Sequence, residues 1–339
     1  MRLRTIAAAG LALASAACAS DLVGPPPSTD RASLFDAVWQ EFDLHYSFFQ
    51  LKGIDWNAVG AKHRPAALAA TSDQAFAAEL ASMFAELKDP HVTLTANGRT
   101  MRYIAPYDTM PTRYNEHATM MKYVASAATT SGGQGHVRYG MAAPNVGYIR
   151  IASFLGGGWG NEIDEALGSL GNAKSIVIDI RGNGGGERGV ANDVAGRFMD
   201  RSRTFGYLRY RNGKNHSDFT NYVTETVDPQ GSHHFSGPVF VLTNRGDYSS
   251  AEDFVLAMRV RPQTTIVGDT TGGASGGPIV RELPNGWTYE LSQWIEYTPN
   301  KTTFEGVGLA PDVVIKPTAA TFAAGKDEVL EQAIALAIR

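Results

Sequence analysis

Several residue types and patterns that mark common functional classes are absent or rare in this 339-residue chain. Its one cysteine, Cys18, cannot form a disulfide within the chain, so no disulfide framework holds the fold together. The 30 Lys and Arg are outnumbered by 34 Asp and Glu, which leaves a net charge of −4 and none of the basic surface of a nucleic-acid-binding domain. Neither a His-x-x-x-His pair nor a Cys/His cluster occurs, so the sequence predicts no metal site.

Long apolar runs are also missing, and the stretch that comes nearest to a membrane-spanning helix lies at the N-terminus. Met1-Arg-Leu-Arg4 is short and basic, and the apolar stretch Ile6–Ala17 that follows ends in small residues. That stretch is shorter than the roughly 20 residues that a membrane-spanning helix needs. A basic start, a short apolar segment and small residues are typical of an export signal, which we predict over residues 1–19.

Cys18 adds a lipid anchor to this prediction. The preceding Leu13-Ala-Ser-Ala-Ala17 looks like a bacterial lipoprotein cleavage site, although Ser15 stands where a leucine is usual. We therefore expect Cys18 to be lipidated in a chain that is periplasmic or at the cell surface, with cleavage after Ala19 as the alternative. Residues 20–30 contain consecutive prolines and are expected to form a linker to the membrane, which the protein contacts only through its lipid.

The segment 31–90 has the pattern of a small helical module. Asp30, Asp55 and Ser72 each precede a stretch with apolar residues at helical spacing, and their side chains can accept hydrogen bonds from the free N–H groups of a first turn. The last of these helices has to end before Pro90, because proline disfavours the helical conformation in the residue before it. The remainder, residues 91–339, is expected to form one core domain.

Short apolar, β-branched stretches alternate with helical patterns in the second half of the chain. Buried strands are predicted at Ser175–Ile180, Pro238–Leu242 and Thr264–Val267, with a helix at Ser250–Arg259. A strand of alternating character is predicted at Val146–Phe154. Because strand, helix and strand in succession form parallel crossovers, the expected fold class is α/β.

Ser249 and Ser250 follow one of these predicted strands, at the turn into the next helix. A serine in such a turn is lifted out of the sheet and lies beside the free backbone N–H groups of the helix start. An acylating serine needs both that exposure and donors for a developing oxyanion. The alternative is that these serines only cap the helix.

Two further segments have patterns that suit acyl transfer. Arg181-Gly-Asn-Gly-Gly-Gly186 follows a predicted strand, and successive glycines allow several N–H groups to converge on one anion. The segment lacks the Gly-Lys-Ser/Thr ending of a nucleotide-binding loop and the spacing of a dinucleotide fingerprint. His91 lies at a helix-to-strand corner, where a histidine is well placed to act as a general base, and the other histidines have no comparable setting.

Four motifs occur in order along the chain, namely Leu87-Lys-Asp-Pro-His91, Asp179-Ile-Arg-Gly-Asn-Gly-Gly-Gly186, Ser249-Ser-Ala-Glu252 and Glu305-Gly-Val-Gly-Leu-Ala-Pro-Asp312. With these motifs the chain resembles the C-terminal processing (tail-specific) serine peptidase family, from about residue 32 to its end. It looks closest to the branch related to the tricorn core and the retinoid-binding protein of the retina. The resemblance implies a Clp-protease/crotonase-like α/β core preceded by a helical module. The family's usual PDZ domain does not fit between His91 and the strand that begins at Val146.

The resemblance also assigns roles to residues of these motifs. It implies that Ser249 is the nucleophile, and that the N–H groups of Gly185 and Ser250 form the oxyanion hole, with Gly184 as a neighbour. Tail-specific members of the family use a lysine as the base, at a position where this chain has Ala274.

The tricorn-like branch instead uses a histidine as the base, which corresponds to His91. A glutamate orients that histidine, and this residue corresponds to Glu305. In that branch a serine precedes the histidine and links it to the glutamate, whereas here Pro90 takes its place. The contact between Glu305 and His91 is therefore expected to be either direct or mediated by water, and no cofactor is implied.

The sequence thus predicts an exported serine endopeptidase that hydrolyses peptide bonds in polypeptides, with C-terminal tails as candidate substrates and no nucleic-acid partner. A non-catalytic peptide- or lipid-binding protein on the same scaffold is the first alternative, because the retinoid-binding relatives carry ligands on this fold. A crotonase-like acyl-CoA enzyme is the second alternative, since one fold supports several chemistries. The export signal argues against it, because acyl-CoA substrates are cytosolic.

Overall fold

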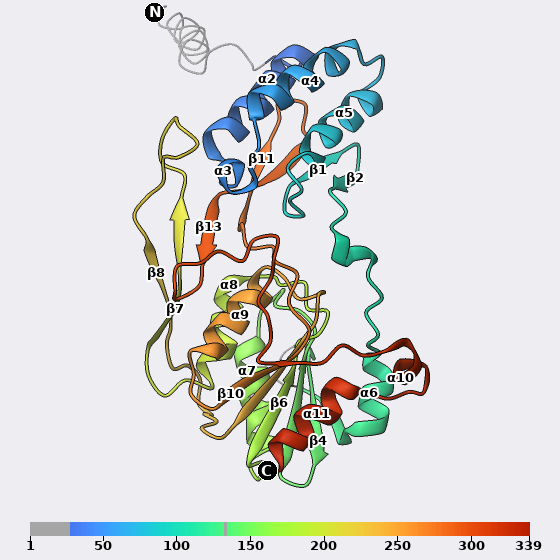
Figure 1. The fold of residues 1–339 in the computed structure, drawn as a ribbon, viewed down its shortest axis with the longest axis vertical. Coiled ribbons are helices and arrows are strands. Elements are labelled where there is room, and N and C mark those ends of the chain that lie inside the picture. Colours follow the sequence, from blue (N-terminus) through green and yellow to red (C-terminus); the bar gives the residue numbers. More distant parts are fainter. Residues whose placement is uncertain (1–27, 132–133) are drawn as a thin grey trace, which may run out of the picture.

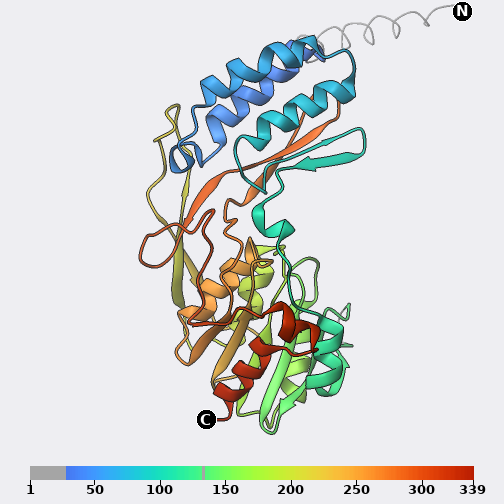
Figure 2. The same ribbon diagram turned by 45° about the vertical axis from the view of Figure 1, so that its right-hand side comes forward.

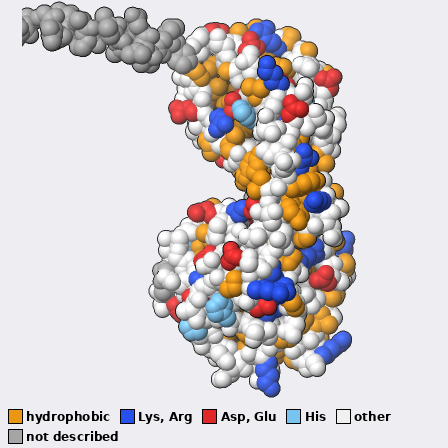
Figure 3. Space-filling model, turned by 90° about the vertical axis from the view of Figure 1, so that its left-hand side faces the viewer, with side chains coloured by type: hydrophobic (Ala, Val, Ile, Leu, Met, Phe, Trp, Pro, Cys, Tyr) orange, Lys and Arg blue, Asp and Glu red, His pale blue; other side chains and the backbone are white. Residues whose placement is uncertain are grey.

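The computed structural model describes residues 28–131 and 134–339, which form two lobes joined by a narrower waist (Figure 1 and Figure 3). We call the lobe that carries the N-terminal helices the helical lobe, and the lobe that carries the large sheet the core lobe. The predicted export signal and Cys18 lie outside the described residues. Within the described ranges, no helix is both long enough and apolar enough to cross a bilayer.

The helical lobe begins with helices whose starts follow from their capping residues. These helices are α2 (Arg31–His45), α3 (Phe49–Lys52), α4 (Trp56–Ala69) and α5 (Asp73–Ala85). Asp30, Asp55 and Ser72 each accept a hydrogen bond from the N–H group three residues later. Each cap satisfies a donor that the first helical turn leaves free, so the predicted starts of α2, α4 and α5 are confirmed.

An antiparallel sheet completes the helical lobe. Its order is β11-β12-β1-β2, with β1 (Thr93–Ala96), β2 (Arg99–Arg102), β11 (Pro278–Glu282) and β12 (Thr288–Ser292). Phe42 of α2 packs against Phe84 of α5, with ring centroids 4.7 Å apart, and against Tyr289 of β12 at 5.8 Å. The hydrophobic cluster of this lobe therefore takes residues from both of the predicted segments 31–90 and 91–339.

The core lobe is built on a larger sheet in the order β14-β10-β9-β6-β5-β4-β3. Its strands are β3 (Ala125–Thr129), β4 (Val137–Ala143), β5 (Val146–Ile151), β6 (Ser175–Asp179), β9 (Val239–Thr243), β10 (Thr264–Gly268) and β14 (Val313–Val314). The strands from β14 to β5 are parallel, whereas β4 and β3 are antiparallel at one edge. The parallel pairing of β6, β9 and β10 is the arrangement predicted from the alternation of strands and helices.

Helices cover both faces of the large sheet (Figure 2). One face carries α7 (Trp159–Ser169), α8 (Arg188–Gly196) and α9 (Ser250–Arg259), and the other carries α6 (Glu116–Tyr123) and α11 (Glu328–Ala337). Along β6, Ile176 and Ile178 belong to the hydrophobic cluster of the first face, and Val177 belongs to that of the second. Strands between two helical layers have to be apolar on both sides, which explains their continuous apolar sequences.

Strand β5 corrects one prediction from the sequence. The pattern of Val146–Phe154 predicts alternating burial, but the strand ends at Ile151 and every residue in it is buried. The reason is that helices lie on both faces of the sheet, so a polar side chain in β5 has to find partners inside the protein. Arg150 does so, because its guanidinium donates to Glu116 and to the carbonyl oxygen of Asp179.

Two connections bound the waist between the lobes. On one side lies a sheet in the order β13-β7-β8, from β7 (Arg203–Tyr210), β8 (Val223–Val227) and β13 (Trp294–Tyr297). On the other side the chain runs from β2 through the short 3₁₀ helix η1 (Pro106–Thr109) to α6 (Figure 1). A short helix, α10 (Ala319–Ala323), precedes α11 in the chain. Hydrophobic side chains gather on the surface of the waist (Figure 3).

Candidate active site

Ser249 lies in a strained turn between β9 and α9. Its φ of 59° and ψ of −133° place a residue with a side chain in a conformation that costs about 1–3 kcal/mol and that clusters at functional sites. The Ser249 N–H donates to the carbonyl oxygen of Ala274 at 2.9 Å, which helps to hold the turn. The Ser249 side chain makes no capping hydrogen bond to α9, so the capping alternative does not describe it.

Ser250 differs from Ser249 in its exposure and in the use of its backbone. Ser250 is only 2% exposed, and its hydroxyl has no hydrogen-bond partner among the described residues. Its N–H is the first of α9 and donates to no carbonyl oxygen in the described part of the chain. Ser249, which is partly exposed, therefore offers an accessible hydroxyl, and Ser250 offers a free N–H beside it.

The glycine-rich turn after β6 lies directly against this serine. Gly185 has a φ of 88°, and a Cβ atom on it would lie 2.9 Å from Ser249 Cβ and 3.0 Å from Ser250 N. Glycine is therefore needed for the close approach of the two turns. The Gly185 N–H, one of the expected oxyanion donors, is engaged here because it donates to Asn183 Oδ1 at 2.8 Å. Gly184 precedes it in the same turn.

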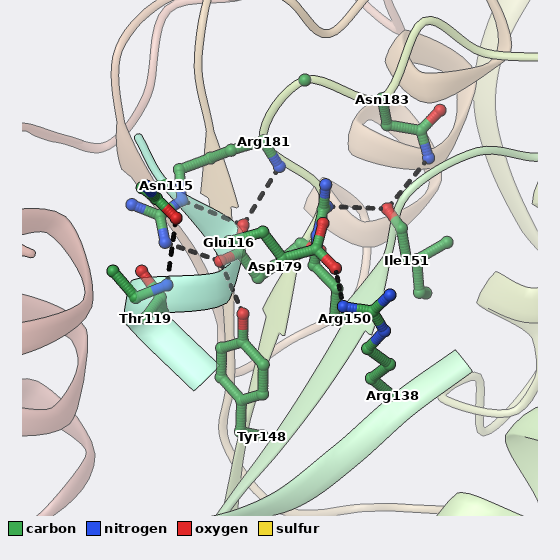
Figure 4. Close-up of polar contacts among 12 residues, drawn as sticks. Asn115, Glu116, Thr119, Arg138, Tyr148, Arg150, Ile151, Asp179, Arg181 and Asn183 are labelled. Atoms are coloured by element: carbon green, nitrogen blue, oxygen red, sulfur yellow. Dashed lines mark hydrogen bonds and ion pairs between the residues drawn. The ribbon is translucent and has the colours of Figure 1, made fainter. Parts of the chain in front are cut away.

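Buried polar contacts at the ends of β5 and β6 fix the glycine-rich turn (Figure 4). The carbonyl oxygen of Ile151 accepts hydrogen bonds from Asn183 Nδ2 at 3.2 Å and from Arg150 Nη1 at 3.0 Å. Arg181 donates to both carboxylate oxygens of the buried Asp179. Burial opposes the ionisation of Asp179, but the charges of Arg181 and Arg150 hold its pKa below the ordinary value. A turn anchored in this way presents its backbone N–H groups in fixed positions.

Glu252 supports the loop opposite the serine. Its carboxyl is buried and accepts hydrogen bonds from Thr271 Oγ1 and from the N–H groups of Gly273 and Ala274, the last two at 2.9 Å. Burial raises the pKa of Glu252 to about 8, against the lowering effect of these donors. Because the carbonyl of Ala274 accepts the Ser249 N–H, Glu252 positions the turn of the nucleophile through this loop.

His91 follows α5, and its side chain is only 10% exposed. Neither ring nitrogen has a hydrogen-bond partner within the described ranges, so no hydrogen bond joins His91 to Ser249 in this structure. Asp89 Oδ1 lies 4.0 Å from His91 Nδ1 and accepts the backbone N–H of His91 at 2.9 Å. Hydrogen bonds between a catalytic base and its nucleophile often form only when substrate binds, and the free ring nitrogens of His91 are available for one.

Glu305 is buried, but its partners differ from the one that the resemblance implies. Lys52 Nζ lies 3.0 Å from Glu305 Oε1, and the Ser275 N–H donates to Glu305 Oε2 at 2.8 Å. No direct hydrogen bond or ion pair between Glu305 and His91 is present in the part of the chain that the structure describes. Burial and the neighbouring charge of Asp89 raise the pKa of Glu305, and Lys52 opposes that shift.

A cleft of about 790 Å³ lies at the waist, next to the segments that carry His91 and Ser249, although neither of these two residues lines it. Pro90 borders it beside His91, and Gly273 borders it beside the loop that holds Ser249. Glu305 lines the same cleft. Its volume lies within the range of about 300–1,000 Å³ that is usual for ligand sites.

Reasoning from the sequence missed three residues that the structure brings to this site. Asp89 and Glu252 lie within the four motifs described above. A carboxylate beside apolar residues that are predicted to be buried is the pattern that could have identified them. Lys52 carried no signal, because its partner Glu305 lies far away in the sequence. Among the residues described, no group of three or more His, Cys, Asp and Glu side chains could hold a metal ion.

Two family profiles match this chain. Residues 145–315, half of the chain, match Peptidase family S41, and residues 27–85 match the Tricorn protease C1 domain. The first match contains the glycine-rich turn, Ser249 and Glu305, and the second contains the helices of the helical lobe.

Solved structures agree with these matches. A protein of Parabacteroides merdae ATCC 43184, provisionally classed as a peptidase, is 31% identical with a TM-score of 0.81, covering 92% of this chain and 98% of its own. Mature CPAF is 12% identical with a TM-score of 0.71, covering 91% and 97%. The photosystem II D1 C-terminal processing protease is 17% identical with a TM-score of 0.56, covering 90% and 97%. The predicted fold class is thereby confirmed.

Curated sequences point to the same family. The carboxy-terminal processing protease CtpA of Bacillus subtilis (strain 168) is 27% identical over 173 residues, which cover 50% of this chain and 34% of the relative. CtpB of the same organism is 27% identical over 51% of this chain and 34% of the relative. The chain thus spans about a third of the length of these two curated relatives.

Proposed function

Because this chain belongs to peptidase family S41, we propose that it is a serine endopeptidase that hydrolyses peptide bonds in exposed or disordered polypeptide segments. The observation that carries the proposal is the uncapped hydroxyl of Ser249, which lies in a strained strand-to-helix turn beside the free N–H of Ser250. Acyl transfer needs such a nucleophile and such a donor next to each other. The names of the Bacillus subtilis relatives support cleavage near the C-terminal ends of substrates.

In the proposed mechanism, Ser249 Oγ attacks the carbonyl carbon of the substrate while His91 takes the serine proton. The tetrahedral oxyanion accepts a hydrogen bond from the Ser250 N–H. His91 then gives the proton to the leaving amine, and the same base activates the water that hydrolyses the acyl-enzyme. The negative charge of Asp89, 4.0 Å from Nδ1, stabilises the imidazolium that forms.

The remaining predicted residues complete this mechanism. The Gly185 N–H serves as the second oxyanion donor once Asn183 Oδ1 releases it, and Gly184 is the neighbouring candidate in the same turn. Glu305, when ionised, adds negative charge near Asp89 and His91, and Lys52 sets how easily it ionises. Each role depends on where charge develops in the transition state, so its loss is expected to lower kcat more than it raises KM.

Hydrolysis of fluorescently labelled casein tests the proposal. We expect the wild type to be active and Ser249→Ala to be inactive, with a melting temperature within a few degrees of the wild type. Lys301→Ala, which removes a side chain that packs over Tyr222 at 4.7 Å, is a control that should keep full activity. Full activity of Ser249→Ala would contradict the proposal.

We also propose that the protein is exported and anchored to a membrane, in the periplasm or at the cell surface, through a lipid on Cys18. The support is the basic, apolar and small-residue pattern of residues 1–19. Cys18→Ser is expected to move the protein from the membrane fraction to the soluble fraction. Wild-type protein that is already soluble, with its N-terminus at Ser20, would contradict lipidation.

One observation favours the second candidate, a non-catalytic peptide-binding protein on the same scaffold. Glu305 pairs with Lys52 rather than with His91, and both ring nitrogens of His91 are unpaired among the described residues. A binding protein would bind peptides with equal affinity before and after Ser249→Ala and would leave a fluorophosphonate unreacted. Covalent labelling of the wild type would exclude this candidate.

A further inference from the structure

A second cavity, of about 160 Å³, lies beside the turn that carries the nucleophile. We call it the basic pocket, and its defining residues are Tyr107, Arg113, Tyr114, Arg245 and Lys316. Among the described residues, Asp269 is the one acidic residue that lines the pocket, so the charges of the side chains around it are mainly positive. No role in the mechanism above uses these residues.

The cations of the basic pocket keep most of their hydrogen-bonding capacity. Arg113 donates from Nη1 to the carbonyl oxygen of Pro317 at 2.6 Å, and Arg245 donates only from Nη1 to backbone carbonyl oxygens. A guanidinium has five N–H donors, so most of them are left for a ligand. Lys316 Nζ lies 3.7 Å from Asp269 Oδ1, which is too long for a strong hydrogen bond.

Arg181 also lines the cavity, but its charge is already neutralised. Its guanidinium donates to both oxygens of Asp179 and both oxygens of Asp327, all buried. The positive charge that a ligand would meet therefore comes from Arg113, Arg245 and Lys316.

Two tyrosines that line the basic pocket have hydroxyl groups without a partner among the described residues. The hydroxyl oxygens of Tyr107 and Tyr114 are buried, and neither has a hydrogen-bond partner among the described residues. Burial raises the pKa of both tyrosines well above the ordinary value, so both keep their protons. A buried polar group without a partner is costly, and a bound acceptor would remove that cost.

The basic pocket adjoins the cleft at the waist, because the two share lining residues. Tyr107, Met110 and Arg245 line both cavities, and the ring of Tyr107 stacks on that of Tyr248 with centroids 5.6 Å apart. Arg245 precedes Ser249 by four residues, which span at most about 14 Å of extended chain. A peptide that lies across Ser249 can thus reach the pocket within a few residues.

We propose that the basic pocket binds a carboxylate of the polypeptide substrate, and so fixes where the chain is cut relative to that group. The inference rests on the proposed peptidase function, because it assigns the substrate of the same cleft. A carboxylate accepts several hydrogen bonds at once from guanidinium and hydroxyl donors, which matches this set. The carboxylate can come from the C-terminus of the substrate or from an Asp or Glu side chain.

Binding to Ser249→Ala measures this recognition without requiring turnover. The probes are three fluorescein-labelled peptides: Ala-Ala-Leu-Ala-Ala as the free acid, the same peptide as the C-terminal amide, and an amide that ends in Asp. We expect the free acid to bind at least about tenfold more tightly than the plain amide, by fluorescence anisotropy, because charge-assisted hydrogen bonds are lost in the amide. The Asp amide binds as tightly as the free acid if a side-chain carboxylate suffices, and as weakly as the plain amide if the C-terminus is required.

Variants of the pocket locate the effect. Arg113→Gln, Lys316→Gln and Tyr114→Phe, each made in the Ser249→Ala background, should reduce the preference for the acid and leave binding of the amide unchanged. Lys174→Gln is the matched control, because it removes the same charge from an exposed residue just before β6, at the end opposite Arg181. It should keep the full preference.

Equal affinity for acid and amide would overturn the inference. So would a preference that survives both charge-removing variants of the pocket, or one that falls equally in Lys174→Gln. Hydrolysis of the same peptides by the wild type is measured in parallel. If the wild type cleaves no peptide while the preference for the acid persists, the proposed function fails and the carboxylate site stands.

Discussion

Replacing Glu252 with glutamine is expected to change protein stability with opposite signs at low and high pH. The carboxyl of Glu252 is buried and has a pKa of about 8, against an ordinary value of 4.5. Below about pH 4.5 the carboxyl is protonated in both the folded and the unfolded protein, so it does not change the free energy of unfolding. Between about pH 4.5 and 8 it is ionised mainly in the unfolded protein, so the free energy of unfolding falls as the pH rises. Ionisation of the unfolded carboxyl therefore lowers the free energy of unfolding by about 1 kcal/mol at pH 5 and by about 4 kcal/mol at pH 8.

Glutamine removes this titration but has one drawback of its own. Its oxygen can accept from Thr271 and Gly273, but its amide group faces the Ala274 N–H, which loses its acceptor at a cost of about 1–3 kcal/mol. Glu252→Gln should therefore be less stable than the wild type at pH 5. At pH 8 it should be more stable than the wild type, because the gain of about 4 kcal/mol from removing the titration then exceeds that cost.

Guanidinium unfolding at several pH values between 5 and 8 measures this difference. Glu282→Gln is the control, because it removes the same charge from an exposed residue of β11 and should shift stability equally little at every pH. A difference between Glu252→Gln and the wild type that stays constant from pH 5 to pH 8 would refute the reasoning. It would mean that Glu252 is ionised in the folded protein throughout this range.

Three further predictions concern the same site. Gly185→Ala should lower kcat at least about 100-fold, because its Cβ would lie 2.8 Å from the Tyr248 carbonyl oxygen and 2.9 Å from Ser249 Cβ. A variant with wild-type kcat would refute the close approach of the two turns. Lys52→Met should destabilise the fold by about 3–5 kcal/mol in thermal unfolding, because it leaves the buried Glu305 carboxylate without its cation. Lys62→Met, at an exposed ion pair, should cost less than about 1 kcal/mol, and equal losses in the two variants would argue against a strong buried pair. His91→Ala should lower kcat/KM about 10²- to 10⁴-fold with an unchanged melting temperature, and undiminished activity would exclude His91 as the base.

Local chemistry explains which parts of the fold could be predicted from the sequence. The starts of α2, α4 and α5 depend on one capping side chain each, and helix α9 has the predicted bounds Ser250–Arg259. The turn at Ser249 was predictable for the same reason, because it lies between a strand and a helix that both have clear patterns.

Contacts between distant segments explain what could not be predicted. The hydrophobic cluster of the helical lobe joins residues of α2 and α5 to β12, and no local pattern reports such a pairing. The ion pair of Lys52 with Glu305 and the hydrogen bond of the Gly185 N–H to Asn183 likewise depend on the tertiary fold. The resemblance to known peptidases could assign roles to Glu305 and Gly185, but it could not show these partners.

The central claim is that Ser249 is the nucleophile of a serine peptidase, and covalent labelling tests it most directly. The wild type is treated with a fluorophosphonate, digested and mapped by mass spectrometry, with Ser249→Ala and Ser250→Ala treated in parallel. We expect a single adduct on Ser249, which is partly exposed, no adduct in Ser249→Ala, and labelling that persists in Ser250→Ala, since Ser250 is only 2% exposed. An adduct on Ser250, or an intact wild-type protein that remains unlabelled, would contradict the account.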